Sequence, residues 1–257
     1  MSTGIGAGIS PVFELTPGKG VSPGFECPTA YSLEIDGLTE LGETGSGIPT
    51  PILGTTGTGD FTISFWFKMP DVTGGGVNQR FMTVNSISGA DWTLQFRGQD
   101  GKAQFTGPWS DIGNYLFTNN TWFHVAYSVD RSNLAKWVVN GVLQDTKNVS
   151  TFPASFTNDG TLYLGSNSSG AQRYEGNITE IAFWDKSLSA SECLELYNNV
   201  DGKCYVADFT FSSNLKNYWN CFNPAGVFTN PLTDLEGLSP INLLNMDASN
   251  VSTDTPL

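Results

Sequence analysis

Three carboxylates lie close together in the stretch YSLEIDGLTE, residues 31–40. Glu34 and Asp36 are two positions apart, so in a β-strand their side chains would share one face. Retaining hydrolysis of a glycosidic bond needs two carboxyl groups about 5–5.5 Å apart, one as nucleophile and one as acid/base. Glu40 lies six residues after Glu34, which is about 20 Å along a strand at roughly 3.3 Å per residue. The spacing argues against catalysis, and we expect no enzymatic activity.

Other catalytic chemistries find even less support. His124 is the only histidine, and we expect it to be a hydrogen-bonded structural residue in the middle of a strand. A Ser–His–Asp or Cys–His mechanism would have to use it, and no nucleophile-elbow motif is present. The four cysteines form no CxxC pair, so a zinc site is not expected. They are Cys27, Cys193, Cys204 and Cys221, and their spacing leaves open whether any of them pair.

Aromatic residues in two polar loops could bind a sugar through an apolar ring flanked by hydrogen-bonding groups. Trp109 and Tyr115 lie in GPWSDIGNY, residues 107–115, and Tyr174 lies in SNSSGAQRYEGN, residues 166–177. Trp109 is the strongest candidate of the three. The alternative, in which Trp109 fills the core at one end of the fold, stays open.

Strand signals fill most of the chain from residue 31 onward. The runs are aromatic or β-branched, and polar turns separate them. They are residues 31–36, 61–69, 80–86, 91–97, 102–107, 121–130, 161–166 and 177–185. Asn140-Gly141, between two apolar pairs, predicts a tight hairpin. One short helix is predicted where Ser189 and Glu192 form a capping box.

The composition also favours strands and excludes some partners. Charged residues make up only 14% of the chain, which contains 29 glycines and 13 prolines, as expected of strands joined by many turns. A net charge of −13 repels phosphate backbones and anionic membranes, so nucleic acid is not an expected partner. No apolar run could span a bilayer, and the first residues lack the features of a signal peptide. We therefore expect synthesis in the cytoplasm without membrane insertion.

Three segments are predicted along the chain. Residues 1–30 are rich in glycine and proline, which disfavours helix and central strand. We expect an extended arm that orders against a neighbouring subunit, or alternatively a disordered tail. Residues 31–204 should form an antiparallel β-sandwich. Residues 205–257 should supply strands that complete this sandwich, followed by a polar tail, although 217–240 could instead be the trace of a lost second copy.

Four stretches carry a resemblance to a known family. They are SLEIDG, FTISFWFK, WFHVAYSVD followed by KWVVNGVLQDT, and LYLGSNSSGAQRYEGNITEIAFWDKSLSASECLELYN. Together they cover roughly residues 31–200 and resemble the laminin-G-like, concanavalin A-like jelly-roll family. The resemblance implies an all-β fold of two packed, curved antiparallel sheets. It does not imply one function, because this architecture is found in lectins, hydrolases, adhesion domains and virion proteins.

Two properties of that family can be compared with these residues. Laminarinase-like hydrolases use a strand motif E-x-D-x-E or E-x-D-x-x-E. Glu34 and Asp36 fit its beginning, but Leu38 and Thr39 stand where the last glutamate would be. Many laminin-G-like domains also hold one calcium ion on a loop rim.

A calcium ion needs about six to eight oxygen ligands. Candidate ligands near turns are Asp36, Asp60, Asp159, Glu175 and Asn177. None of them matches a defined calcium loop, and Asp-Gly is also a turn signal in its own right. We expect no cofactor, with calcium as the open alternative.

These observations lead us to expect a non-enzymatic structural protein on the surface of a phage or other virus particle. It would be a capsid decoration protein, a fibre or a minor capsid component, bound to other virion proteins or to copies of itself through the arm. Host-surface polysaccharide is a further expected partner. The alternative is a stand-alone lectin or adhesion module that binds polysaccharide, and a laminarinase-like hydrolase ranks third.

Overall fold

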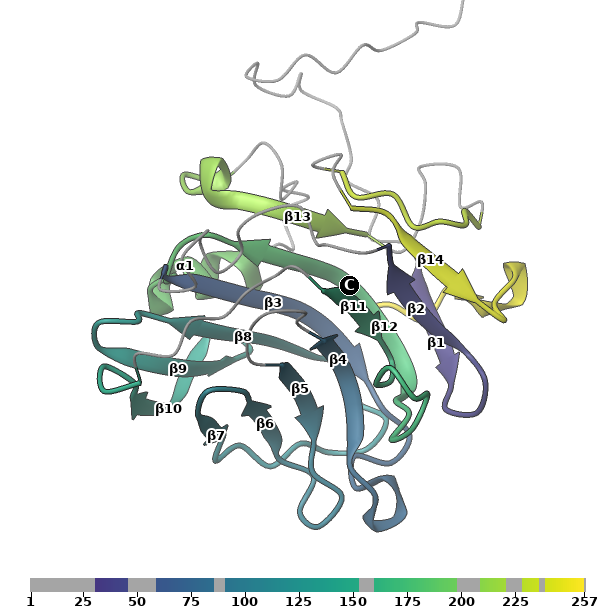
Figure 1. Ribbon diagram of the computed structural model, residues 1–257, viewed down its shortest axis with the longest axis horizontal. Coiled ribbons are helices and arrows are strands. Elements are labelled where there is room, and N and C mark those ends of the chain that lie inside the picture. The colour runs from purple at the N-terminus through teal and green to yellow at the C-terminus, as the bar shows by residue number, and fades with distance from the viewer. Residues whose placement is uncertain are drawn as a thin grey trace, which may run out of the picture.

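Two antiparallel sheets pack face to face in the described part of the protein (Figure 1). The computed structural model describes residues 31–45, 59–85, 91–152, 160–197, 209–220, 228–235 and 239–256. The expected N-terminal arm, residues 1–30, lies outside these ranges. The predicted fold class, an all-β antiparallel sandwich with one short helix, is confirmed. Among these residues no helix has the length and apolar character needed to cross a membrane.

The first sheet, sheet A, has eight strands, seven of them in the order β10-β9-β8-β3-β12-β1-β15, with β13 also paired to β12. Its strands are β1 (Ser32–Asp36), β3 (Phe61–Lys68), β8 (Phe123–Val129), β9 (Leu134–Val139), β10 (Val142–Asn148), β12 (Glu175–Trp184), β13 (Leu215–Trp219) and β15 (Val251–Ser252). The β9–β10 hairpin turns at Asn140 and Gly141, whose φ angles are 48° and 73°. A tight primed turn requires such positive φ values, so the predicted hairpin is confirmed.

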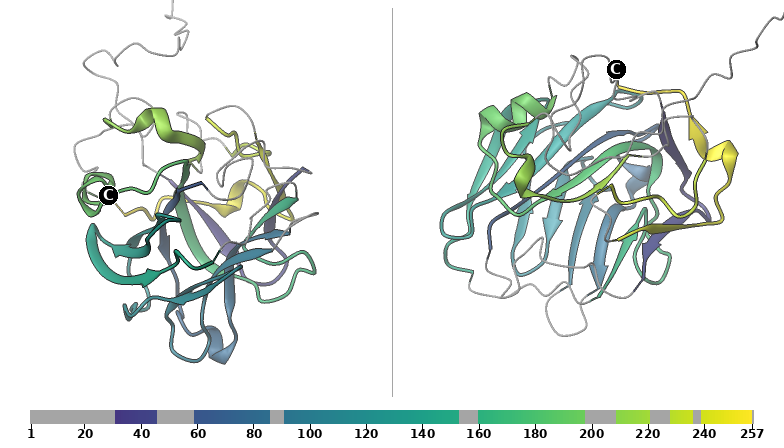
Figure 2. Two further views of the ribbon diagram at one scale, coloured as in Figure 1. Left: turned by 60° about the vertical axis from the view of Figure 1, so that its left-hand side comes forward. Right: turned by 90° about the horizontal axis from the view of Figure 1, so that it is seen from above.

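The second sheet, sheet B, has seven strands in the order β14-β2-β11-β4-β5-β6-β7. Its strands are β2 (Leu41–Thr44), β4 (Gln79–Asn85), β5 (Trp92–Phe96), β6 (Ala103–Thr106), β7 (Ser110–Ile112), β11 (Thr161–Leu164) and β14 (Ile241–Leu244). Figure 2 shows the two curved sheets from two further directions. Because β14 pairs with β2, the C-terminal part of the chain adds a strand to sheet B as well as strands to sheet A.

The long strand β12 carries two different neighbours on one edge. Its beginning pairs with β1, where Asp36 lies opposite Glu175. Its end pairs with β13, where Ile181 lies opposite Trp219. On the other edge β12 pairs with β3 along most of its length. Strands from the start, middle and end of the described chain therefore meet on β12, and β13 belongs to the same sandwich.

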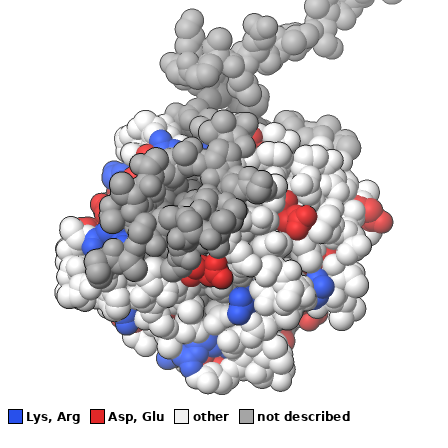
Figure 3. All heavy atoms as spheres, viewed as in Figure 1, with Lys and Arg blue, Asp and Glu red and all other residues white. Residues whose placement is uncertain are grey.

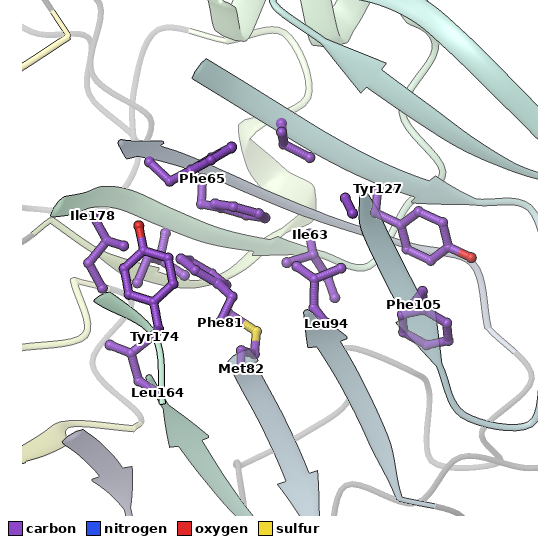
Figure 4. Close-up of a cluster of buried hydrophobic side chains, with 14 of the residues drawn as sticks. Ile63, Phe65, Phe81, Met82, Leu94, Phe105, Tyr127, Leu164, Tyr174 and Ile178 are labelled. Atoms are coloured by element: carbon purple, nitrogen blue, oxygen red, sulfur yellow. The ribbon is translucent and has the colours of Figure 1, made fainter. Parts of the chain in front are cut away.

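The main core lies between the two sheets (Figure 4). Its side chains come from alternate positions of the strands, as expected when one face of each strand is buried. The phenyl rings of Phe65 in sheet A and Phe81 in sheet B stack with centroids 3.9 Å apart. Phe105 and Tyr127 stack across the sheets at 4.8 Å. The high aromatic content of the sequence therefore fills this interior.

A third layer covers the outer face of sheet A. It contains the helix α1 (Ala190–Tyr197) and the short 3-10 helix η3 (Ser212–Asn214), which directly precedes the sheet A strand β13. The apolar cluster under this layer, called the outer cluster, comprises Ala126, Val138, Ala182, Trp184, Leu188, Cys193, Leu196, Phe209, Phe211, Leu215 and Tyr218. Phe183 points into the main core while its neighbour Trp184 points into the outer cluster. Sheet A is thus buried on both faces in this region.

The helix begins as its sequence predicts. The backbone amide of Glu192 donates to the Ser189 hydroxyl at 3.2 Å, and the backbone amide of Ser189 donates to Oε2 of Glu192 at 2.8 Å. These reciprocal bonds form the capping box. Cys193, on the buried side of this helix, has a free thiol, and the other three cysteines lie outside the described residues.

The polar C-terminal segment is ordered against sheet A. It contains the 3-10 helix η4 (Ala248–Asn250) and strand β15, which pairs with β1. Asp254 accepts hydrogen bonds from Nζ of Lys68 at 2.5 Å and from Nε1 of Trp122 at 2.8 Å. The sequence showed no reason for this tail to be ordered by itself. The order comes from these contacts with residues distant in the sequence.

Candidate functional site

The carboxylates of Asp36 and Glu40 hold the turn after β1. Oδ1 of Asp36 accepts hydrogen bonds from the backbone amides of Leu38 at 2.7 Å and Thr39 at 3.1 Å. Oε2 of Glu40 accepts from the backbone amide of Asp36 at 2.6 Å, and Oε1 accepts from Nδ2 of Asn250 at 2.6 Å. Both groups therefore stabilise the backbone in this region.

The environment of Asp36 is unsuited to proton donation. Burial works to raise the pKa of its carboxyl group, but the backbone amides of residues 38–40 and the positive charge of Arg173 more than offset this effect. The pKa of Asp36 consequently lies below its ordinary value. A general acid in glycoside hydrolysis needs a raised pKa, so Asp36 is not such an acid at neutral pH.

The expected exposed position of Trp109 is wrong. Its side chain is only 3% exposed and belongs to the main core. Nε1 donates a hydrogen bond to the hydroxyl oxygen of Tyr127 at 2.8 Å, and the Arg131 guanidinium lies 4.8 Å from the ring centroid. The alternative stated for this residue, a side chain that fills the core, is the one observed. Trp109 therefore offers no ring to a sugar at the surface.

The two tyrosine candidates also pack inside the protein. Tyr174 is fully buried, and its hydroxyl donates to the backbone oxygen of Asn177 at 3.0 Å. Tyr115 is partly buried, and its ring lies 4.9 Å from that of Phe117 and 5.6 Å from that of Phe123. The structure does not bring these two tyrosines and Trp109 together as a stacking surface.

His124 is completely buried, as a structural residue would be, but it is not hydrogen-bonded through its ring. Neither ring nitrogen has a partner in the described structure, which corrects the expectation of a hydrogen-bonded histidine. The ring lies 5.3 Å from that of Trp66. Burial lowers the pKa of His124 to about 3, so the side chain is neutral at physiological pH.

The expected calcium ligands are divided between different places. Asp159 lies outside the described residues. Asp60 accepts a hydrogen bond from the backbone amide of Arg131 at 2.9 Å. Asp36, Glu175 and Asn177 line one surface pocket, but among the described residues no group of three Asp, Glu, His or Cys side chains is close enough to hold a metal ion.

Two adjoining pockets lie where the loops after β1, after β3 and before β12 meet. The larger one, called the loop pocket, has a volume of about 470 Å³, which is within the range of about 300–1,000 Å³ typical of ligand sites. Its polar lining includes Asp71, Gln79, Gln172, Arg173 and Glu175. The smaller pocket, called the sheet pocket, has a volume of about 280 Å³ and lies beside it along β1 and β12.

Asp71 organises the glycine-rich wall of the loop pocket. Its Oδ1 accepts hydrogen bonds from the backbone amide and the hydroxyl of Thr73 at 2.9 and 2.7 Å. Its Oδ2 accepts from the amide of Gly75 at 2.9 Å. The Thr73 hydroxyl, followed by the amides of Thr73 and Gly75, lowers the pKa of Asp71. These contacts fix the loop that contains the 3-10 turn η1 (Gly74–Gly76).

The side chain of Gln79 connects the glycine-rich wall to the start of β12 through hydrogen bonds. Its Nε2 donates to the backbone oxygen of Asp71 at 2.8 Å, and its Oε1 accepts from the backbone amide of Glu175 at 2.9 Å. Gln79 is 5% exposed, and both the nitrogen and the oxygen of its amide form hydrogen bonds within the protein. The loop pocket is therefore built on a buried side chain that joins two of its walls.

The solvent-accessible polar side chains of the loop pocket lie on the wall formed by residues 172–175, opposite the glycine-rich wall. Gln172 and Arg173 are half-buried, while Glu175 is exposed. Oε1 of Gln172 accepts a hydrogen bond from Nε of Arg80 at 2.5 Å, which orients its amide nitrogen away from that contact. Gln172 has a φ of 54°, a left-handed conformation that is unusual for a residue other than glycine. Such local strain is often found at functional sites.

We expect Gly170→Ala to destabilise the protein by about 1 kcal/mol and to disturb the loop pocket. Gly170 has a φ of +69°, and an added Cβ would lie 2.8 Å from Nη2 of Arg173. The substitution therefore strains the backbone and pushes the guanidinium from its position. Urea-induced unfolding measures the loss, and Ser168→Ala in the same loop is the control. An unchanged midpoint for Gly170→Ala would contradict the expectation.

Local sequence patterns do not reveal the loop pocket, because its residues belong to three separate loops. The signals present in the sequence are Gly74-Gly75-Gly76 and the SNSSG run that ends at Gly170. Each of these only predicts a turn. Their convergence on Arg173 and Glu175 depends on which strands are neighbours.

Comparison with known proteins begins with the sequence. It matches the concanavalin A-like lectin/glucanases superfamily, in its laminin G form, over residues 42–193. A search of curated proteins gives no significant match. Among solved structures, a candidate carbohydrate-binding protein from Bacteroides ovatus is similar at a TM-score of 0.62 and 15% identity, over 88% of this chain and 59% of that one.

Two further solved structures share the fold. A SAP-like pentraxin from Limulus polyphemus has a TM-score of 0.50 and 11% identity over 66% of this chain and 82% of that one. The binding domain of botulinum neurotoxin serotype D has a TM-score of 0.51 and 18% identity over 66% of this chain and 42% of that one. The sequence match itself spans more than half of the 257 residues, and the two-sheet architecture agrees with it. This chain therefore belongs to the concanavalin A-like lectin/glucanase superfamily.

Proposed function

We propose that this chain is a carbohydrate-binding domain that takes a glycan in the loop pocket. The observation that carries the proposal is the convergence of Gln172, Arg173 and Glu175 on a polar pocket of about 470 Å³ with glycine-lined walls. The similarity of the fold to a candidate carbohydrate-binding protein over 88% of this chain supports it. The whole protein in that comparison is longer, since this chain covers 59% of it.

The lining groups suit the hydroxyl groups of a sugar. The guanidinium of Arg173 can only donate hydrogen bonds and the carboxylate of Glu175 accepts them, while a sugar hydroxyl does both. Glycines at positions 74, 75 and 170 allow a ring to approach the backbone closely. Val77 lines the pocket and is 56% exposed, so it supplies an aliphatic contact where an aromatic ring was expected.

We expect Arg173→Ala to weaken glycan binding by about tenfold or more, because a hydrogen bond to a charged group contributes roughly 1.5–3 kcal/mol. A glycan array, followed by titration calorimetry with the strongest ligand, measures the effect. Lys216→Ala is the matched control, since it also removes one positive charge but at β13, where Lys216 pairs with Asp185 at 2.9 Å. Circular dichroism checks that both variants are folded.

The outcomes of this comparison are distinct. Equal affinity of wild type and Arg173→Ala would remove the loop pocket as the binding site. Failure of the wild type to bind any glycan on the array would overturn the proposed function itself.

The proposed binding takes place without hydrolysis. Asp36 lies directly opposite Glu175 in the β1–β12 ladder, so two carboxylates do flank the pockets. However, Asp36 is committed to backbone amides with a lowered pKa, and Glu175 is exposed to solvent, whereas a glycosidase acid is normally held in a desolvating environment. Release of reducing ends from laminarin that disappears in Glu175→Gln would contradict this part of the proposal.

The virion role expected from the sequence receives no support from the proteins compared above, which are a candidate carbohydrate-binding protein, a pentraxin and a toxin binding domain. That role and a location on virus particles stay predictions. Carbohydrate binding, the alternative stated with it, is the better supported function. A glycan or a glycosylated receptor is the corresponding partner.

A further inference from the structure

The loop pocket and the sheet pocket form adjoining parts of one surface. Both are lined by Glu175, and the loop pocket is lined by Gly37 where the sheet pocket is lined by its neighbour Asp36. Asp36 and Glu175 are paired across β1 and β12. The two hollows are thus separated by one cross-strand pair, so Glu175 lies on the direct path from the loop pocket to the sheet pocket.

The sheet pocket offers a second set of groups that bind hydroxyls. Asn120 and Asn177 contribute amides, and Glu34 contributes a carboxylate. Nδ2 of Asn177 donates to the Ser32 hydroxyl at 3.2 Å, which fixes the amide plane. Asn120 is exposed, so its side chain lies at the rim of the pocket. Its φ is 55°, a backbone conformation that glycine adopts readily.

The C-terminal segment closes one side of the sheet pocket. Asp254 is one of the lining residues, and it is held by Nζ of Lys68 and Nε1 of Trp122 at 2.5 and 2.8 Å. The ion pair with Asp254 neutralises Lys68, whose ammonium group is the one that lines this pocket among the residues that the structure describes. The other polar side chains of its described lining are carboxylates and amides, beside the apolar Ile35 and Pro70.

The charge around both pockets is negative. Carboxylates line them at five positions, Glu34, Asp36, Asp71, Glu175 and Asp254, against two cations, Lys68 and Arg173. The chain as a whole carries a net charge of −13. In the view of Figure 3 the charged groups of the described residues are few and scattered among uncharged surface and form no broad positive area. A negatively charged glycan would be repelled from the pockets.

We infer that the two pockets act together on an uncharged glycan chain, with one sugar unit in the loop pocket and the next in the sheet pocket. This inference rests on the proposed function, since it assigns the ligand class and the second subsite of the same site. It adds a role for Asn120, Asn177 and Glu34, and it excludes glycans rich in uronic acids or sialic acid.

The test uses the full chain and defined probes. Laminarin, galactomannan and soluble starch serve as neutral polysaccharides, and alginate and polygalacturonate serve as acidic ones. Fragments of one, two and four units from the neutral polysaccharide that binds best are then titrated by calorimetry. We expect the affinity to rise about tenfold from one to two units, as two or more added hydrogen bonds would produce, and the acidic polymers to bind more weakly than the neutral ones.

Variants of the sheet pocket separate the two subsites. Asn120→Gly removes the side chain at a positive φ that glycine tolerates, and Asn177→Ala removes the second amide. Both should reduce the gain from one to two units. Glu43→Gln, on β2 and outside both pockets, removes one negative charge and should keep the gain.

The results distinguish the inference from the function on which it rests. Equal affinity for one and two units, or a gain unaffected by both asparagine variants, would overturn the second subsite while leaving the loop pocket as a sugar site. Preference for alginate or polygalacturonate would overturn the ligand class. No binding of any glycan would overturn the proposed function together with this inference.

Discussion

Replacing Trp184 by alanine is expected to lower the free energy of unfolding by about 3–5 kcal/mol, the usual range for removing a buried tryptophan. The side chain is fully buried in the outer cluster. Its ring lies 5.1 Å from that of Phe211, and Nε1 donates to the Ser64 hydroxyl at 3.2 Å. The substitution loses this burial and leaves a cavity between sheet A and the layer that covers it.

Urea-induced unfolding, followed by tryptophan fluorescence and circular dichroism, measures this loss. Leu194→Ala is the control on the covering helix, because Leu194 is 41% exposed and its truncation should change stability by no more than about 0.5 kcal/mol. A loss below about 1 kcal/mol for Trp184→Ala would mean that α1 and η3 are not packed on sheet A as described. The variant therefore tests the third layer specifically.

The second large effect concerns pH and the buried carboxyl group of Glu180. We expect Glu180→Gln to be more stable than the wild type at pH 8 by about 3 kcal/mol, and about equally stable at pH 4. Glu180 is 2% exposed and accepts a hydrogen bond from the hydroxyl of Tyr218. Burial raises its pKa from 4.5 to about 7, while the bond from Tyr218 acts in the opposite direction.

The direction of the effect follows from proton linkage. Below pH 4.5 the carboxyl group is protonated in both the folded and unfolded states, so folding carries no ionisation penalty. Between pH 4.5 and about 7 the unfolded state releases the proton while the folded state retains it, and stability falls as the pH rises. Above about pH 7 the folded state contains a buried charge, and the loss is complete. Glutamine has no such titration.

Glu192→Gln provides a control of opposite sign. Burial tends to raise the pKa of Glu192, but the ammonium group of Lys186 and the capping bonds at Ser189 hold it below its ordinary value. The wild-type carboxylate therefore stabilises the protein above about pH 4.5, and Glu192→Gln should be the less stable protein at pH 7. If the stability difference between Glu180→Gln and wild type is constant from pH 4 to pH 8, Glu180 does not titrate in the folded protein as described.

Glu180 lies at a β-bulge, where its backbone has a positive φ angle and its side chain is buried. Its φ is +54°, and the register between β12 and β3 shifts between Thr179 and Ala182. A bulge of this kind redirects a side chain away from the regular alternation of the strand. It turns Glu180 toward Tyr218 on β13, where the hydrogen bond satisfies the carboxyl group. The sequence NITEIAFWD predicts the strand but contains no sign of the bulge.

Much of the fold could be predicted from local patterns. The FTISFWFK run predicts a strand, and every residue of it except Lys68 is buried. Asn140-Gly141 predicts the hairpin turn, and Ser189 with Glu192 predicts the helix start. Each of these features depends on residues within a few positions of one another, because turn and capping preferences are properties of a short backbone segment.

The candidate site could be predicted only in part. The sequence indicated Asp36, Glu175 and Asn177 as polar residues near turns, and the structure brings these three together in the sheet pocket. The sequence also favoured Trp109 as a surface ring, whereas it is a core residue hydrogen-bonded to Tyr127. A tryptophan among Gly, Ser and Asp is compatible with either position, since burial depends on what packs over it and not on its neighbours in the chain.

By itself the amino-acid sequence determined the all-β class, the positions of most strands, the tight hairpin and the capped helix, because these follow from side-chain alternation and local hydrogen bonding. Only the tertiary structure decided that Asp36 faces Glu175, that Arg173 and Gln172 meet a glycine-rich loop, and that the C-terminal Asp254 completes a second pocket. Such contacts are set by the order and register of strands far apart in the chain, and that register depends on the total burial of apolar surface by the whole sandwich.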